Sequence, residues 1–190
     1  MIFSLDVRRA RKGDCLLLHF GSKKQPGLVM IDGGPSDVFA PQLRPRLLKI
    51  KDARGLGQGA PLPVDVLMVS HVDDDHIKGI LDLTRELIGQ PEGSRAVRVA
   101  SLWHNSFDDV IGNTPKELTA ALTAQFGTAS LEGELPEDAA IESGEGDEED
   151  EEVVESSLKV LASIEQGHRL RTDADKLAID LNTEFGGKLI

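Results

Sequence analysis

The chain has 190 residues, 39% of them hydrophobic, and a formal net charge of −12. These values suit one soluble domain over residues 1–190, and no apolar run approaches the roughly 20 residues that a membrane span needs. The single cysteine, Cys15, excludes an internal disulfide and is expected to pack as a small hydrophobic side chain. Residues 1–7 lack the features of a signal peptide, so the expected compartment is the cytoplasm.

Apolar runs bounded by turn residues predict a sheet with helices beside it. The stretch 38–54 is expected to be helical, with Pro41 and Pro45 confining its regular part to the end. Helical periodicity over 76–89 and 153–166 predicts two further amphipathic helices, and Thr114 is a good cap for another. The runs that read as strands are 2–7, 15–20, 27–32, 64–69 and 97–103. The fold class is therefore α/β.

The most informative stretch is 70–79, which places two imidazoles and three carboxylates directly after the strand expected at 64–69. Imidazole nitrogen and carboxylate oxygen are the ligands that hold zinc, manganese or iron. His71 and Asp73 are two residues apart and point the same way in extended backbone, whereas Asp74 points away. If a helix begins there, Asp75 and His76 can converge on a second point nearby. The pattern predicts a divalent metal site, with room for two metals that would drive hydrolysis.

This stretch resembles the His-x-His-x-Asp-His signature of the metallo-β-lactamase superfamily, and its flanks agree. Residues 13–18 and 28–34 look like the opening hairpin and the Asp-Gly turn of that fold, and 76–80 looks like the start of its first long helix. The nearest branch is the hydrolases similar to the soluble domain of DNA-uptake competence proteins. The resemblance covers roughly residues 1–105. It implies an αβ/βα sandwich, of which this chain holds the N-terminal half.

The resemblance also implies roles for individual residues. His71 would bind a first metal, and Asp75 and His76 a second. Asp73 stands where the family usually has a histidine; an added carboxylate shifts the preference from zinc, the first expectation, toward harder ions such as manganese. Asp32 would lie beneath the site and orient ligands.

Two further residues, His104 and Asn105, follow the strand expected at 97–103. They could line the site, or His104 could be an ordinary core or surface histidine. His168 lies in a polar stretch and is expected to be solvated.

The function that these features imply is metal-dependent hydrolysis, in which a metal-bound hydroxide attacks an ester, amide or phosphodiester. Asp75 is the catalytic candidate and would also orient that hydroxide. A phosphodiester or nucleic-acid substrate is expected from the resemblance. The alternative is a non-catalytic regulatory or interaction module that keeps an incomplete half-fold.

Because the ligands of the family's second half are absent, the 190-residue chain alone is expected to bind metal weakly and to be inactive. Near-continuous apolar strands are typical of a sheet buried on both faces, so a half-fold would leave one face open for association. The expected partner is the missing C-terminal half or a second copy.

Charge is unevenly distributed along the chain. The segment of about 142–152 is rich in carboxylates and is expected to be flexible or solvated. Basic residues cluster at 8–12 and at 44–54, where phosphate-rich substrates could be drawn, although a solvated helix face explains the second cluster equally well.

Overall fold

The computed structural model describes residues 2–57, 59–105 and 148–187, with side chains described for 3–57, 59–105 and 162–187. This part of the chain forms one six-stranded mixed sheet in which the spatial order follows the sequence order. The first three strands pair antiparallel and the later pairs are parallel. The strands are β1 (Ile2–Val7), β2 (Leu16–Gly21), β3 (Pro26–Ile31), β4 (Leu62–Val69), β5 (Val97–His104) and β6 (Asp180–Leu181).

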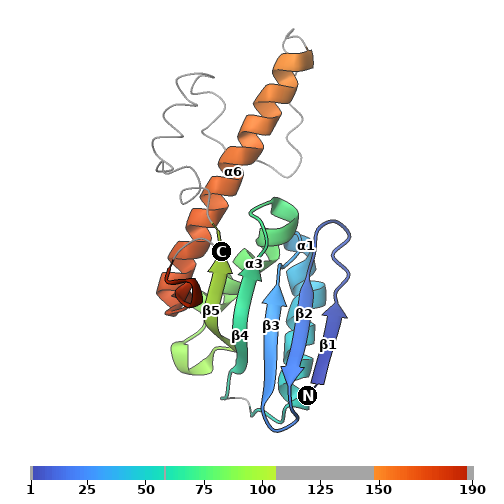
Figure 1. Cartoon of the computed structure of the whole chain (residues 1–190), viewed down its shortest axis with the longest axis vertical. Coiled ribbons are helices and arrows are strands. Elements are labelled where there is room, and N and C mark those ends of the chain that lie inside the picture. Colours follow the sequence, from blue (N-terminus) through green and yellow to red (C-terminus); the bar gives the residue numbers. More distant parts are fainter. Residues whose placement is uncertain (1, 58, 106–147, 188–190) are drawn as a thin grey trace.

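Helices cover one face of this sheet, as Figure 1 shows. The longest, α6, packs beside α3 and β6. The described helices and helical turns are α1 (Ser36–Val38), the π-helical turn η1 (Phe39–Leu43), α2 (Arg44–Ala53), α3 (Asp74–Gly89), the 3-10 turn η2 (Glu92–Ser94), α6 (Glu148–Leu177) and the 3-10 turn η4 (Thr183–Phe185). Within the described ranges, no helix is both long enough and apolar enough to cross a membrane.

The helix-covered face holds the core. Leu17, Met30, Leu67 and Leu102 are register partners on four neighbouring strands, and each is fully buried. Because successive side chains of a strand point to opposite faces, their neighbours in sequence lie on the other face. These four leucine and methionine side chains therefore form part of the core between the sheet and the helices α2 and α3.

The other face of the sheet is apolar but only partly covered by the described residues. On β1, the exposed fractions of Phe3, Leu5 and Val7 are 74%, 52% and 65%. Neighbouring apolar side chains of this face are half-buried: Leu16, Leu18, Val29, Ile31, Val66 and Met68. We call these nine residues the open face. The described helices pack on one face only, so among the described residues the other face is left open, as the sequence predicted.

The five predicted strands are confirmed to within a residue or two. The predicted 38–54 helix is divided: Pro41 lies in η1, where a missing N–H interrupts the α-helical ladder, and Pro45 lies in the first turn of α2. The predicted 76–89 helix begins two residues earlier, because Asp74 and Asp75 are favourable at the positive end of the helix dipole.

The predicted 153–166 helix belongs to the longer α6. The expected helix cap at Thr114 and residues 142–147 of the acidic segment lie outside the described residues, whereas 148–152 begin α6. The sequence did not predict β6, which pairs with β5 near Asn182. The Asn182 side chain both donates to the carbonyl oxygen and accepts from the backbone N–H of His104.

Candidate metal centre

The predicted metal-binding stretch lies at the carboxyl ends of the parallel strands β3 and β4. Residues 32–34 follow β3, residues 70–73 follow β4, and α3 begins directly afterwards. The loop 8–15 returns to the same edge, because β1 runs parallel to β3. Neighbouring parallel strands bring their carboxyl-end loops together, which is where α/β proteins commonly place their ligands.

Close backbone contacts hold these loops against α3. The Gly33 N–H donates to the His76 carbonyl at 2.7 Å, and the Gly79 N–H donates to the Gly34 carbonyl at 2.8 Å. A Cβ at Gly79 would lie 2.0 Å from the Gly33 carbonyl oxygen, so only glycine permits this approach. On the other side, a Cβ at Gly13 would lie 1.7 Å from the Asp75 carbonyl oxygen. The first turn of α3 is thus fixed from two sides.

Asp32 lies beneath this turn, where the resemblance placed it. It has a left-handed φ of 54°, which Asp tolerates better than most residues, and only 2% of it is exposed. Its carboxylate accepts from the Ser70 N–H at 2.8 Å and from the Ser70 hydroxyl at 2.6 Å. The other partner is Nδ1 of His76, at 3.0 Å from Oδ2. A charged acceptor with several donors holds the β4–α3 loop in one conformation.

The two histidines are oriented in the same way. His71 Nδ1 lies 2.9 Å from the Ser70 hydroxyl, and His76 Nδ1 is bonded to Asp32. Their rings are 3.7 Å apart between centroids. An Nδ1–H donated to Asp32 leaves Nε2 of His76 as the lone-pair nitrogen, which is how metal-ligating histidines are commonly held.

The Nε2 atoms face the predicted carboxylates. His71 Nε2 is 3.6 Å from Asp73 Oδ2, and His76 Nε2 is 3.8 Å from Asp75 Oδ2. The structure therefore places the four residues predicted as metal ligands in one loop as two His–Asp pairs with the histidine rings in contact, but it does not gather the ligand atoms of any three of them within 4.8 Å of one another. Their side chains range from nearly buried for His76 to mostly exposed for Asp73, so a cation could enter from solvent.

Asp74 points away from this group. It pairs with Lys78 at 2.7 Å and accepts from the Gln166 amide, which links α3 to α6. Burial alone would raise the pKa of Asp74, but the hydrogen bonds from Gln166 and Lys78 outweigh it and lower that pKa. Its carboxylate thus has a structural role.

Sequence reasoning missed Asp14. Ligand atoms of Asp14, Asp32 and His76 all lie within 4.8 Å of one another, so these three could also hold a cation. Asp14 lies in the loop before β2, and only the packing of Gly13 on α3 brings it here. The local signal was an acidic residue at the start of a strand, which is too common to identify a ligand.

His104 lies one strand away, paired in register with Val69 at the end of β4. It is fully buried, and a Cβ on Gly167 of α6 would lie 3.4 Å from its Nε2 and 3.5 Å from Val72. Burial, with a smaller contribution from Arg171, lowers the pKa of His104 to about 4, although the Gly167 backbone opposes this. The ring therefore packs under α6 beside the loop, while Asn105 is exposed.

Two other predicted features can be placed. Cys15 is buried at the start of β2, and burial raises the pKa of its thiol to about 12, so it packs as a hydrophobic side chain as expected. His168 is exposed on α6, as expected.

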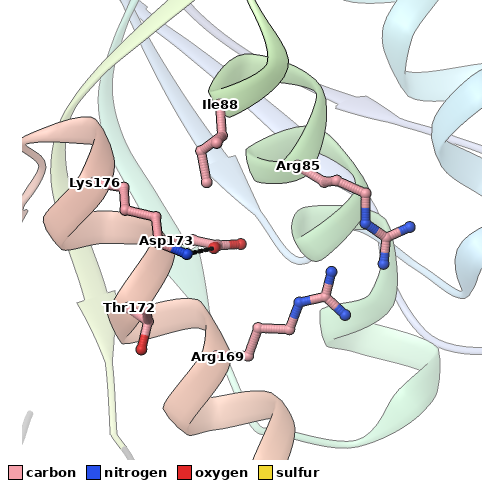
Figure 2. Close-up of a pocket in the computed structure, with 6 residues that line it drawn as sticks. All are labelled: Arg85, Ile88, Arg169, Thr172, Asp173 and Lys176. Atoms are coloured by element: carbon pink, nitrogen blue, oxygen red, sulfur yellow. Dashed lines mark ion pairs between the residues drawn. The ribbon is translucent and has the colours of Figure 1, made fainter. Parts of the chain in front are cut away.

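A hollow of about 340 Å³ between α3 and α6 is the other candidate near this region. Figure 2 shows Asp173 pairing with Lys176, at 3.8 Å, among the residues that line it. The Asp173 carboxylate also accepts from the Thr84 hydroxyl at 2.7 Å, and Arg85 pairs with Asp82 at 3.4 Å. Of these contacts, the Thr84–Asp173 hydrogen bond joins α6 to α3, whereas each ion pair lies within one helix. Its lining residues are Arg85, Ile88, Arg169, Thr172, Asp173 and Lys176.

Comparisons with known proteins add no relative. No protein-family model matches the chain, and no curated protein matches it either.

Proposed function

We propose that this chain carries the metal-binding loop of a metal-dependent hydrolase. One observation supports the proposal: His71 and His76 direct Nε2 toward Asp73 and Asp75, while their Nδ1 atoms contact Ser70 and Asp32. Two imidazoles and two carboxylates are a donor set that suits zinc, manganese or iron. The residues present therefore fit a divalent cation.

Several of the chain's own residues would have distinct roles in the reaction. When bound, a divalent cation would lower the pKa of a water and polarise a substrate oxygen. Asp32 holds the His76 tautomer, and Ser70 links Asp32 to His71. Asp75 is half-exposed at the mouth of the site. Its carboxylate would orient the attacking water by accepting a hydrogen bond from it.

A phosphodiester or a nucleic acid is the proposed substrate. Besides the family resemblance, support comes from the loop 8–15, which carries Asp14 at the site. Arg9 and Lys12 on this loop are exposed and have no ion-pair partner among the described residues. Cations beside a site attract phosphate oxygens.

The remaining ligands would come from a protein surface packed on the open face, either a second copy or a C-terminal half. An apolar face with partly exposed side chains is typical of a surface that another protein layer covers. With that layer in place, the arrangement would be the αβ/βα sandwich of the resembled superfamily, and the cytoplasm would be the compartment.

Calorimetry of the metal-stripped chain with Zn²⁺ and with Mn²⁺ tests the metal proposal. We expect one weak saturable site, and His71→Ala should weaken it at least about tenfold because it removes a ligand. His168→Ala, the same change at an exposed helical histidine, should leave it unchanged. Absence of saturable binding, or equal weakening by both variants, would contradict the proposal.

The open face favours a second candidate function, a non-catalytic interaction module. Sedimentation of the wild type and of Leu5→Lys separates the two candidates, because Leu5 is exposed on β1. Association that Leu5→Lys abolishes, together with no saturable metal binding, would support the interaction module. Association together with metal binding that depends on His71 would support the hydrolase.

A further inference from the structure

A large basic hollow lies at the opposite end of the sheet from the metal centre. It is formed by the β2–β3 hairpin, the end of α2 and the loop that leads into β4. Its volume is about 840 Å³, within the range of small-molecule sites in proteins. We call it the basic pocket. The lining residues that matter here are His19, Ser22, Lys23, Lys24, Arg46 and Arg54.

The charge of the basic pocket is opposite to that of the chain. The chain carries a net charge of −12, yet no carboxylate is among the described residues that line this pocket. Asp6, the nearest carboxylate to Arg46, forms ion pairs with both Arg46 and Arg8. Lys23 and Lys24 are exposed and have no ion-pair partner within the described part of the chain. An excess of positive charge therefore remains at the rim.

Two pocket-lining residues have a buried nitrogen without a hydrogen-bond partner among the described residues. The Arg54 guanidinium donates from Nη2 to the Gly27 carbonyl at 3.1 Å, but its Nη1 is buried and unpartnered there. Nε2 of His19 is also buried without a partner. A buried N–H donor without an acceptor is destabilising. An oxyanion in the pocket would supply an acceptor to Arg54, and to His19 when Nε2 carries the proton.

Burial also shifts the pKa values of Arg54 and His19. Burial lowers the pKa of Arg54, and the charge of Asp65 only partly opposes this. Burial lowers the pKa of His19 as well, helped by the charge of Arg46. A negatively charged ligand would favour the charged form of each group, and this attraction would strengthen its binding.

We propose that the basic pocket binds a small phosphate-bearing molecule of nucleotide size. A guanidinium presents paired donors that match phosphate oxygens, and the two lysines add point charges. The pocket is a local hollow, and the other basic cluster, at 8–12, lies at the far end of the sheet. A polyanion such as nucleic acid would need a continuous basic stripe, so a compact ligand fits better. This inference does not depend on the proposed hydrolase.

Calorimetry of the whole chain in EDTA, with adenosine monophosphate and inorganic phosphate as probes, tests the proposal without any metal. We expect saturable binding of the monophosphate, and weaker binding of inorganic phosphate at the same place. The double variant Lys23→Gln/Lys24→Gln should weaken binding at least about fivefold, since it removes two charges near the anion. These lysines are exposed on the hairpin, so this variant is expected to fold.

The matched control is Arg169→Gln/Lys176→Gln, which removes two exposed cations on α6, outside both the basic pocket and the metal centre. It should bind the monophosphate like the wild type. Arg54→Gln should weaken binding, because it removes a guanidinium that lines the pocket. Binding of a single-stranded DNA oligonucleotide but of neither small probe would overturn the proposal. So would no saturable binding, or weakening by the control equal to that of the lysine variant.

Discussion

The two ends of the sheet are built in different ways. At the carboxyl ends of β3 and β4, backbone contacts at Gly33 and Gly79 leave no room for a side chain. At the other end, the β2–β3 hairpin also requires glycine, since a Cβ at Gly21 would lie 2.4 Å from the Gln25 carbonyl oxygen, but in the loops that lead into β4 and β5 a Cβ at Gly57 or Gly93 would meet nothing within 4 Å. The first end gathers acidic and imidazole groups, and the second surrounds a basic hollow. The loops at the carboxyl ends of β3 and β4 should therefore tolerate far less substitution than the loops before β4 and β5.

The largest expected effect is that of Gly79→Ala. The added Cβ would overlap the Gly33 carbonyl, and backbone on both sides must move, so we expect a loss of at least about 3 kcal/mol in the free energy of unfolding. Urea denaturation measures it. Gly89→Ala, on the same helix but facing open space, should be neutral or slightly stabilising. If both variants lost the same free energy of unfolding, the backbone contact at Gly79 would not be the reason for the loss, and the contrast between the two ends of the sheet would not hold.

A comparable effect should appear with pH. The folded pKa of His104 is about 4, below the unfolded value near 6.5, so the unfolded chain binds more protons between these values. The contribution is fully present above pH 6.5 and is lost as the pH falls toward 4. We expect a loss of roughly 3 kcal/mol over this window from His104 alone.

Denaturation curves of the wild type and of His104→Leu between pH 7 and pH 4.5 isolate this contribution. The variant should show a flatter dependence of stability on pH, whatever its absolute stability. Parallel curves would mean that His104 does not stay neutral in the folded protein.

A smaller effect is expected from Ser70→Ala. The Ser70 hydroxyl joins Asp32 to His71, and its loss should cost about 1 kcal/mol and weaken metal binding roughly tenfold. Ser94→Ala is the matched control, because the Ser94 hydroxyl bonds only the Pro91 carbonyl in the loop before β5. Weakened metal binding in the control would show that the two ends are coupled.

The smallest effect is expected from Gly57→Ala in the loop before β4. A Cβ there meets nothing within 4 Å, so the free energy of unfolding should change by less than about 0.5 kcal/mol. Thermal unfolding would detect a larger change, which would indicate that this loop is more constrained than its contacts suggest.

The sequence predicted the five long strands and α3 because alternation, turn residues and helical spacing are local signals. It also predicted that His71, Asp73, Asp75 and His76 share one loop, where the structure shows them as two His–Asp pairs and not as one cluster of ligand atoms. It did not identify Asp14, which reaches the site through the tertiary contact of Gly13 with α3.

The role of Ser70 and the strand β6 were missed for the same reason. Ser70 acts through Asp32, which is distant in sequence, and β6 depends on Asn182 bonding the backbone of His104. The open face has a different origin. Its residues are apolar, as in strands that are buried on both faces, but this pattern does not predict which element covers the open face.

The contact between Gly33 and Gly79 also has a consequence for how the chain folds. It joins segments that are far apart in sequence, and such contacts form late because long loops must close first. The loop that carries the predicted ligands therefore has no local precursor: a peptide spanning β4 and α3 would carry the four predicted ligands but not the Asp32 carboxylate that bonds Ser70 and His76. Metal binding with native selectivity should appear only in the last step of folding, and so can serve as a kinetic marker of the completed domain.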